Sequence, residues 1–249
     1  MISLSSRRKH ALDARVDAAC AGGKPGDPAP AASTGWMNGL WDLHPRLNGR
    51  LLFLRGFLQH PREVASIVPS SRFVEQRIIK LAAASSAATV VELGPGTGGT
   101  TRAILRALQR DARLLSIEIN PVFHALLGRI EDPRFIVHLG SAEELREALS
   151  RYGLPAPQAI ISGVPFSTMG RARACGILDT IAEVLAPGGR FVAYQVRDQV
   201  HRLCRPYLGP ARVEVELLNI PPLRVFQWEK NVVSPRQQPP RDVRPRLRT

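Results

Sequence analysis

Residues 90–99 read VVELGPGTGG, which is the strongest local pattern in the sequence. An apolar run leads directly into four closely spaced glycines, as where a buried strand turns sharply into a helix. The order Gly-Pro-Gly-Thr-Gly-Gly is not typical of dinucleotide-binding loops, because Pro95 stands inside it and Glu92 precedes the first glycine. No Gly-Lys-Ser/Thr follows, which excludes a P-loop. We therefore predict a strand, a glycine loop and a helix, with Glu92 placed to accept a hydrogen bond from a cationic ligand group.

A second acidic residue follows at the end of the next apolar run. Residues 114–119 read LLSIEI, and Glu118 lies 22 residues beyond Gly96. A carboxylate at the end of a parallel strand can accept two hydrogen bonds from a ribose diol. The alternative is a solvated acid at a strand end. Because Glu118 follows a glycine loop, the pair favours a site for a nucleoside cofactor.

Short β-branched runs alternate with helical stretches along most of the chain, which is typical of a mostly parallel sheet covered on both faces. We predict an α/β fold with a doubly wound, Rossmann-like sheet of seven strands, in which the last strand is antiparallel. The predicted strands are 89–93, 114–119, 135–139, 159–162, 190–196, 213–218 and 223–228. The predicted helices are 100–110, 121–130, 141–150 and 171–185.

The two ends of the chain differ in composition from this middle part. Residues 1–35 are rich in Ala, Gly, Pro and Arg, and residues 231–249 form a Pro- and Arg-rich tail, so both are predicted to be disordered arms. Residues 36–85 are predicted to form amphipathic helices that cap a membrane or substrate site, and residues 86–230 the sheet domain. The 34 basic and 21 acidic residues give a formal net charge of +13, which favours polyanions or an anionic membrane surface.

Residues 46–60 read RLNGRLLFLRGFLQH and favour the membrane as partner. Leu47, Leu51, Leu54 and Leu58 recur at helical spacing with arginines on either side, a pattern typical of an interfacial helix. The alternative is a helix that simply packs on the core. Since no apolar stretch is predicted to serve as a secretory signal or a membrane span, we expect a cytoplasmic protein, peripheral at the inner face of the membrane.

Four motifs together resemble the class I S-adenosylmethionine-dependent methyltransferases. They are ELGPGTG at 92–98, Glu118, GSA at 140–142 and LAPGG at 185–189. The resemblance implies S-adenosylmethionine as cofactor, with Glu92 facing its amino end, Glu118 holding the ribose hydroxyls, and the turn at 140–142 contacting adenine. Ser141 stands in that turn where an aspartate is usual. The cofactor-binding residues that the resemblance implies are Glu92, Gly94, Gly96, Thr97, Gly98, Glu118, Ile119, Ser141, Ala142 and Ser162, and it implies no metal.

A further set of motifs resembles the bacterial phospholipid N-methyltransferases that act on phosphatidylethanolamine. The set comprises VPSS at 68–71 ahead of a helix, the glycine loop, SGVP at 162–165 and NIPP at 219–222. One departure is YQVR at 194–197, where a Thr-Tyr pair is usual. The resemblance implies an N-methyltransferase for the amine of a membrane lipid headgroup, with phosphatidylethanolamine and its methylated forms as the first expectation.

Methyl transfer to an amine requires an unprotonated nitrogen held in line with the methyl group. Ser162 and the backbone of its loop are expected to orient the amine. The candidates for a general base are Tyr194 and His60, with release of the proton to water as the alternative. Phe166 is expected to offer a cation–π contact to a methylated ammonium.

Three other functions remain open on the sequence alone. An rRNA adenine N6-dimethyltransferase would explain the positive charge and the glycine loop, but Ser162 and Phe166 replace the Asn and Tyr expected there. A methyltransferase acting on another aminolipid, such as ornithine lipid, fits the same motifs. A binding module without turnover would retain the fold alone. No obligate protein partner is predicted, and nucleic acid is the less favoured partner.

Overall fold

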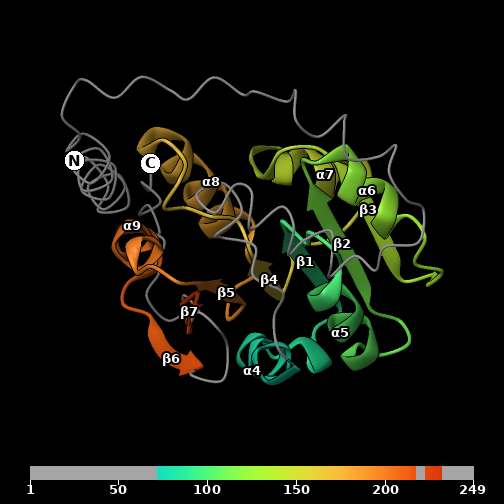
Figure 1. The fold of residues 1–249 in the computed structure, drawn as a ribbon, viewed down its shortest axis with the longest axis horizontal. Coiled ribbons are helices and arrows are strands. Elements are labelled where there is room, and N and C mark those ends of the chain that lie inside the picture. The colour runs from blue at the N-terminus through green and yellow to red at the C-terminus, as the bar shows by residue number, and fades with distance from the viewer. Residues whose placement is uncertain (1–71, 217–221, 232–249) are drawn as a thin grey trace, which may run out of the picture.

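The structure, a computed structural model, describes residues 72–216 and 222–231. Within this part of the chain, seven strands form a single sheet in the order β3-β2-β1-β4-β5-β7-β6 (Figure 1). The strands are β1 (Thr89–Leu93), β2 (Arg113–Glu118), β3 (Phe135–Leu139), β4 (Ala159–Ser162), β5 (Arg190–Gln195), β6 (Arg212–Glu216) and β7 (Leu223–Glu229). The predicted α/β fold with seven strands is confirmed.

The first five strands are parallel to one another and to β6, and only β7 runs in the opposite direction. β7 lies between β5 and β6 and is antiparallel to both. From β1 the chain proceeds outward to β2 and β3, whereas from β4 it proceeds the other way to β5, so the order reverses between β1 and β4. Open α/β sheets bind ligands outside the carboxyl ends of the strands at such a reversal. The fold therefore predicts a ligand site at the loops that follow β1 and β4.

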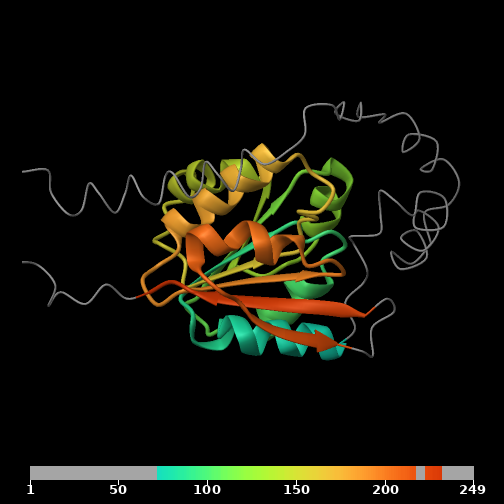
Figure 2. The same ribbon diagram turned by 90° about the vertical axis from the view of Figure 1, so that its left-hand side faces the viewer.

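Helices cover both faces of the sheet. α4 (Arg72–Ala82) and α5 (Gly99–Ala107) pack on one face, and α7 (Leu145–Arg151), α8 (Arg171–Val184) and α9 (Gln199–Leu208) pack on the other. Figure 2 shows α4 on one side of the strands and α8 and α9 on the opposite side. α6 (Pro121–Leu127) contacts β2 and β3, and short 3-10 turns occur at η2 (Ala84–Ser86) and η3 (Ala142–Glu144).

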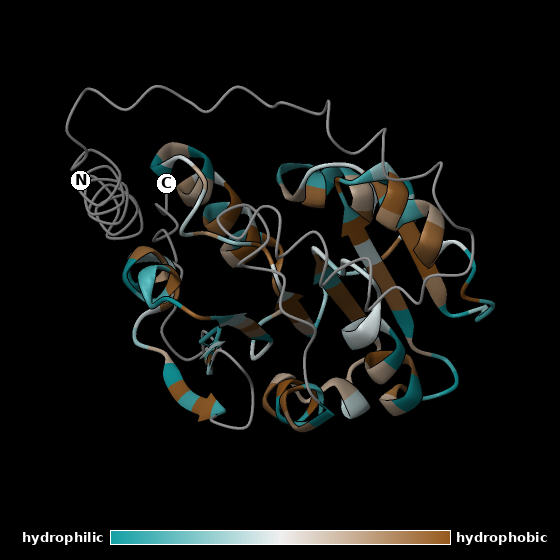
Figure 3. Cartoon of the chain, in the orientation of Figure 1, coloured by the Kyte–Doolittle hydropathy of each residue, from teal (hydrophilic) through white to brown (hydrophobic). Residues whose placement is uncertain are grey.

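Two apolar clusters fill the space between the sheet and these helices. One joins alternate residues of the central strands to α7, α8 and α9, and the other joins the remaining strand residues to α4 and α5. Figure 3 shows the central strands largely in the hydrophobic colour. Because strands buried on both faces read as continuous apolar runs, a charged side chain inside one of them is conspicuous. Glu92 in β1 is such a residue, with no exposed surface.

Several predicted elements differ from the structure by one to three residues at their ends, and three larger differences concern the helices. The predicted helix 141–150 is two elements, η3 and α7, because Ser141 caps the 3-10 turn with its side chain. α9 was not predicted, since its proline and arginines obscure the apolar spacing of Val200, Leu203 and Cys204, which are buried. The helix expected after residue 71 is α4, and its Val74 and Ile78 belong to the core of the sheet domain.

Several predictions concern residues outside the described ranges, namely the arms at 1–35 and 231–249 apart from residue 231, the interfacial segment 46–60, and His60. Between residues 72 and 216 and between 222 and 231, no helix is both long enough and apolar enough to span a bilayer.

Candidate active site

The glycine loop follows β1 as predicted and leads directly into α5. Gly94, Gly96 and Gly98 all have positive φ angles, of 69°, 56° and 81°. A Cβ on Gly94 would lie 3.3 Å from Val164 Cγ2, and one on Gly98 would lie 2.8 Å from Leu127 Cδ2. Both the backbone conformation and the close neighbours therefore require glycine at these two positions. The loop is consequently held close to the segment that follows β4.

Glu92 is fully buried beneath this loop. Its Oε2 accepts hydrogen bonds from Thr101 Oγ1 at 2.7 Å and from Ser116 Oγ at 2.8 Å. Its Oε1 is buried and has no hydrogen-bond partner within residues 72–216 and 222–231. Burial is the main cause that raises the pKa of Glu92 to about 7, although the two hydroxyl groups lower it. A buried carboxylate with one free oxygen is suited to a cationic group that would complete its hydrogen bonds.

Glu118 lies at the end of β2 and ties that strand to the glycine loop. Its Oε2 accepts from the Gly96 N–H at 3.0 Å, and its Oε1 accepts from the Asn120 N–H at 2.8 Å. Burial raises the pKa of Glu118, and the backbone hydrogen bonds oppose this effect. Each carboxylate oxygen has a second lone pair, so both oxygens remain able to accept from a diol. Ile119 follows with 63% of its surface exposed, an apolar side chain beside the carboxylate.

The turn after β3 is held by its own side chains. Ser141 Oγ accepts from the Glu143 N–H at 3.2 Å, and the Ser141 N–H donates to Glu144 Oε1 at 2.9 Å. Arg173 on α8 donates to Ser141 Oγ at 3.2 Å and to Glu143 Oε2 at 2.8 Å. Ser141 and Ala142 are half-buried. The Ser141 hydroxyl thus serves the turn, and its expected contact with adenine stays a prediction.

The segment after β4 packs against the glycine loop. The Gly163 N–H donates to the Leu93 carbonyl oxygen at 2.9 Å, and the Val164 N–H donates to Ser162 Oγ at 3.2 Å. Ser162 has no exposed surface. We call residues 162–164 the acceptor loop. This loop lies at the point where the strand order reverses. Its serine closes a local turn and so fixes the path of the loop.

Two residues at the end of β5 contact the acceptor loop. A Cβ on Gly163 would lie 2.5 Å from Tyr194 Oη, so the phenol packs directly on this glycine. Gln195 Nε2 donates to the Val164 carbonyl oxygen at 2.6 Å. Burial and then the nearby Glu92 carboxylate raise the pKa of Tyr194 well above its ordinary range. Tyr194 therefore stays protonated at neutral pH.

The expected cation–π role of Phe166 is wrong in this structure. Phe166 has no exposed surface and lies in the apolar cluster beneath α8. The chain turns inward after Pro165, because burying an aromatic ring there stabilises the core more than exposing it would.

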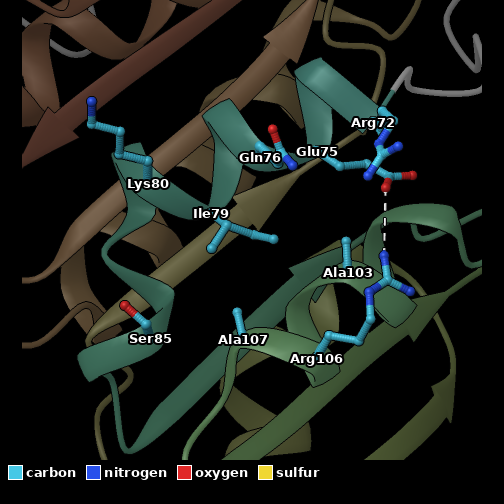
Figure 4. A pocket seen from close by; sticks show the side chains of 9 residues that line it. All are labelled: Arg72, Glu75, Gln76, Ile79, Lys80, Ser85, Ala103, Arg106 and Ala107. Atoms are coloured by element: carbon cyan, nitrogen blue, oxygen red, sulfur yellow. Dashed lines mark ion pairs between the residues drawn. The ribbon is translucent and has the colours of Figure 1, made fainter.

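A pocket of about 510 Å³ lies between α4 and α5. Figure 4 shows Arg106 reaching from α5 toward Glu75 of α4, with Lys80 at the opposite end. The ion pair Arg106–Glu75 measures 3.7 Å, and the three basic side chains that line the pocket are exposed. Glu75 also approaches the glycine loop, since its Oε1 lies 3.2 Å from where a Cβ on Gly99 would be.

The residues of the glycine loop and of the ends of β1 and β2 fit S-adenosylmethionine. The unpaired Glu92 Oε1 suits the amino group, and the carboxylate of Glu118 suits the ribose diol. The glycine loop with the partly exposed Thr97 provides the close backbone approach, and the exposed Ile119 provides an apolar surface. The structure therefore brings together the predicted residues after β1, β2 and β4, and the turn with Ser141 and Ala142 follows the neighbouring β3.

Sequence reasoning missed three polar side chains of this site, namely Thr101, Ser116 and Gln195. Ser116 had a signal, because it is the one hydroxyl in the apolar run LLSIEI. Thr101 and Gln195 had no such signal in the sequence, since a single polar residue in a helix or at a strand end is common. Their roles follow from hydrogen bonds to residues that lie distant in sequence.

Comparison with known proteins shows similarity to two methyltransferase sequences. The ornithine lipid N-methyltransferase of Singulisphaera acidiphila is 29% identical over 178 residues, which cover 70% of this chain and 93% of the relative. The ribosomal RNA small subunit methyltransferase A of Phenylobacterium zucineum is 32% identical over 96 residues, but these cover only 38% of this chain and 32% of that protein. No protein-family model matches.

Solved methyltransferase structures share the fold. The N-methyltransferase NodS of Bradyrhizobium japonicum, in complex with S-adenosyl-L-homocysteine, has a TM-score of 0.54 and 14% identity, covering 74% of this chain and 99% of NodS. The O-methyltransferase TomG of Streptomyces achromogenes, in complex with S-adenosylmethionine, also has a TM-score of 0.54 and 14% identity, covering 79% of this chain and 95% of TomG.

The sheet order, the glycine loop and these similar structures define the class I methyltransferase fold. Together with the similarity to a methyltransferase along nearly its whole length, they confirm the predicted enzyme class and cofactor: the chain is an S-adenosylmethionine-dependent methyltransferase.

Proposed function

We propose that this enzyme methylates the amine of a membrane aminolipid. The observation that carries the proposal is the similarity to an ornithine lipid N-methyltransferase over 93% of that protein. Ornithine lipid is therefore the first acceptor to test, and phosphatidylethanolamine with its methylated forms, the first expectation from the sequence motifs, is the second.

The reaction is an in-line displacement in which positioning contributes most of the acceleration. S-adenosylmethionine, when bound, supplies a methyl group activated by a positively charged sulfur. The lipid amine forms the new C–N bond as the C–S bond breaks, S-adenosylhomocysteine leaves, and one proton leaves the nitrogen for water. The protein must therefore hold an uncharged amine in line with the methyl group and exclude other nucleophiles.

Ser162 and Tyr194 act on the amine through the acceptor loop. Ser162 Oγ fixes the Val164 N–H, and the protonated phenol of Tyr194 packs on Gly163. Both contacts restrict the path of the loop backbone beside the glycine loop. Because Tyr194 has a raised pKa, it holds its proton, and release of the amine proton to water is the favoured route.

The membrane surface is the proposed partner. A net charge of +13 favours anionic lipids, each basic side chain near the surface adding about 1 kcal/mol. The amphipathic pattern of residues 46–60 supports an interfacial helix at the inner face of the membrane.

An rRNA adenine dimethyltransferase is the second candidate. The net charge and the 32% identity to a ribosomal RNA methyltransferase over 96 residues favour it. The segment that begins at Ser162 disfavours it, because Ser162 offers no amide to the base and Phe166 is buried in the core.

To test this, the purified protein is incubated with labelled S-adenosylmethionine in parallel reactions. One contains vesicles with ornithine lipid, one contains vesicles with phosphatidylethanolamine, one contains phosphatidylcholine alone, and one contains ribosomal RNA. Label in either aminolipid but not in phosphatidylcholine supports the proposal. Label confined to RNA overturns it in favour of the second candidate.

A further inference from the structure

We propose that Gln195 is the hydrogen-bond acceptor that positions the amine of the methyl acceptor, an inference that rests on the proposed function and names the residue that recognises its substrate. β5 pairs with β4 so that Ala193 lies opposite Ser162. Two residues further along, Gln195 returns to the same face of the sheet, because side chains alternate along a strand. Gln195 therefore lies beside the acceptor loop at the carboxyl end of the sheet.

The carboxamide of Gln195 has one defined orientation. Its Nε2 lies 2.6 Å from the Val164 carbonyl oxygen. A carbonyl oxygen can only accept, so the nitrogen and not the oxygen must face Val164. Oε1 therefore points away from Val164. The hydrogen bond to Val164 fixes which of the two amide atoms is the oxygen.

The Oε1 atom is a buried acceptor with no donor. Gln195 is only 8% exposed, and Oε1 has no hydrogen-bond partner among the described residues. Buried polar atoms are nearly always paired, so an unpaired one beside a ligand site indicates a group that the ligand completes. Among the described residues of this sheet edge, only Glu92 has a second such oxygen, and it lies on the opposite face, where it is assigned to the cofactor.

An amide oxygen suits an amine that must lose a proton before it reacts. It accepts an N–H from a neutral or a protonated amine, so it binds both forms. A carboxylate at the same position would stabilise the ammonium form and raise the pKa of the substrate nitrogen. Gln195 thus orients the amine without opposing the loss of its proton.

Two substitutions separate this role from a purely structural one. Gln195→Met removes both the acceptor and the donor to Val164. Gln195→Glu keeps an acceptor oxygen but removes the N–H that donates to the Val164 carbonyl oxygen. If Gln195 only supports the acceptor loop, both variants lose activity in the same way and keep the pH profile of the original enzyme. Gln227→Met, on the adjacent strand β7, is the matched control, because Gln227 is also a strand glutamine and is half-buried.

The experiment measures kcat and KM for the aminolipid in mixed vesicles from pH 6 to pH 10, with binding of S-adenosylhomocysteine as a check on folding. We expect Gln195→Met to raise KM for the lipid about tenfold or more, with cofactor binding unchanged. We expect Gln195→Glu to keep KM within a few-fold and to shift the kcat profile to higher pH, and Gln227→Met to match the original enzyme.

The outcomes distinguish this inference from the function on which it rests. Equal KM in Gln195→Met and the original enzyme, or an unshifted profile in Gln195→Glu, overturns the role of Gln195 alone. An original enzyme that labels no aminolipid overturns the proposed function, and the inference with it.

Discussion

The Gly96 N–H donates to Glu118 Oε2 at 3.0 Å, so the glycine loop is tied to the end of the neighbouring strand. The other oxygen of the same carboxylate accepts from the Asn120 N–H. One side chain therefore fixes the loop that approaches the cofactor and also supplies acceptors for the ribose diol. The loss of this carboxylate should affect cofactor binding more than folding.

We expect Glu118→Gln to weaken binding of S-adenosylhomocysteine by about tenfold or more, since hydrogen bonds to a charged group are the stronger ones. An amide offers one oxygen where the carboxylate offers two, so one of the two backbone N–H groups would face an NH2. Isothermal titration calorimetry measures the change. Glu131→Gln, an exposed position, is the control, and equal affinities for the two variants would refute the role of Glu118.

Cofactor affinity should rise with pH because of Glu92. Its pKa is raised to about 7, and only the ionised form pairs fully with a cationic amino group. Binding that requires the ionised form lowers this pKa, so affinity increases as the pH rises through about 7 and then levels off. We expect S-adenosylhomocysteine to bind about tenfold more tightly at pH 8 than at pH 6. A Glu92→Gln variant that keeps the same pH dependence would show that another group titrates.

Gly163 should not tolerate a side chain. A Cβ there would lie 2.5 Å from Tyr194 Oη and 2.9 Å from the Gly94 carbonyl oxygen. We expect Gly163→Ala to reduce kcat strongly, and the double variant Gly163→Ala/Tyr194→Phe to recover part of the loss, because the second change removes the nearer of the two clashing atoms. Kinetics of the two single variants and the double variant test this. Strictly additive losses would contradict the contact.

The hydroxyl of Ser162 should contribute to both stability and turnover. Ser162→Ala leaves the Val164 N–H without its acceptor, at a cost of about 1 to 3 kcal/mol in the free energy of unfolding. Urea denaturation measures this cost, and steady-state kinetics should show a lower kcat for the lipid. An unaltered kcat would remove Ser162 from the orientation of the amine.

The strands and the glycine loop that position this site can be predicted from the sequence, because buried strands appear in it as short apolar runs. β1, β3 and β4 have the predicted bounds, and each is a short run of apolar or β-branched residues. The glycine loop follows β1 as expected, with α5 beginning one residue early because Gly98, in the left-handed conformation, ends the loop. Glu92 and Glu118 lie where the motif order places them.

The polar contacts that complete the site are not predictable in the same way. The bond from Gln195 to Val164 joins residues 31 apart, and it depends on the path of the acceptor loop after β4. The same loop path buries Phe166, which the sequence alone presented as a candidate for contact with substrate. Such details follow from tertiary packing, which no local pattern encodes.

The most direct test of the proposed aminolipid methyltransferase is mass spectrometry of the lipid product. The purified enzyme is incubated with S-adenosylmethionine and vesicles that contain ornithine lipid or phosphatidylethanolamine, and the extracted lipids are fragmented. We expect one of these lipids to gain methyl groups on the nitrogen of its headgroup. Unmodified headgroups in both vesicles, from a protein that still binds S-adenosylhomocysteine, would contradict it.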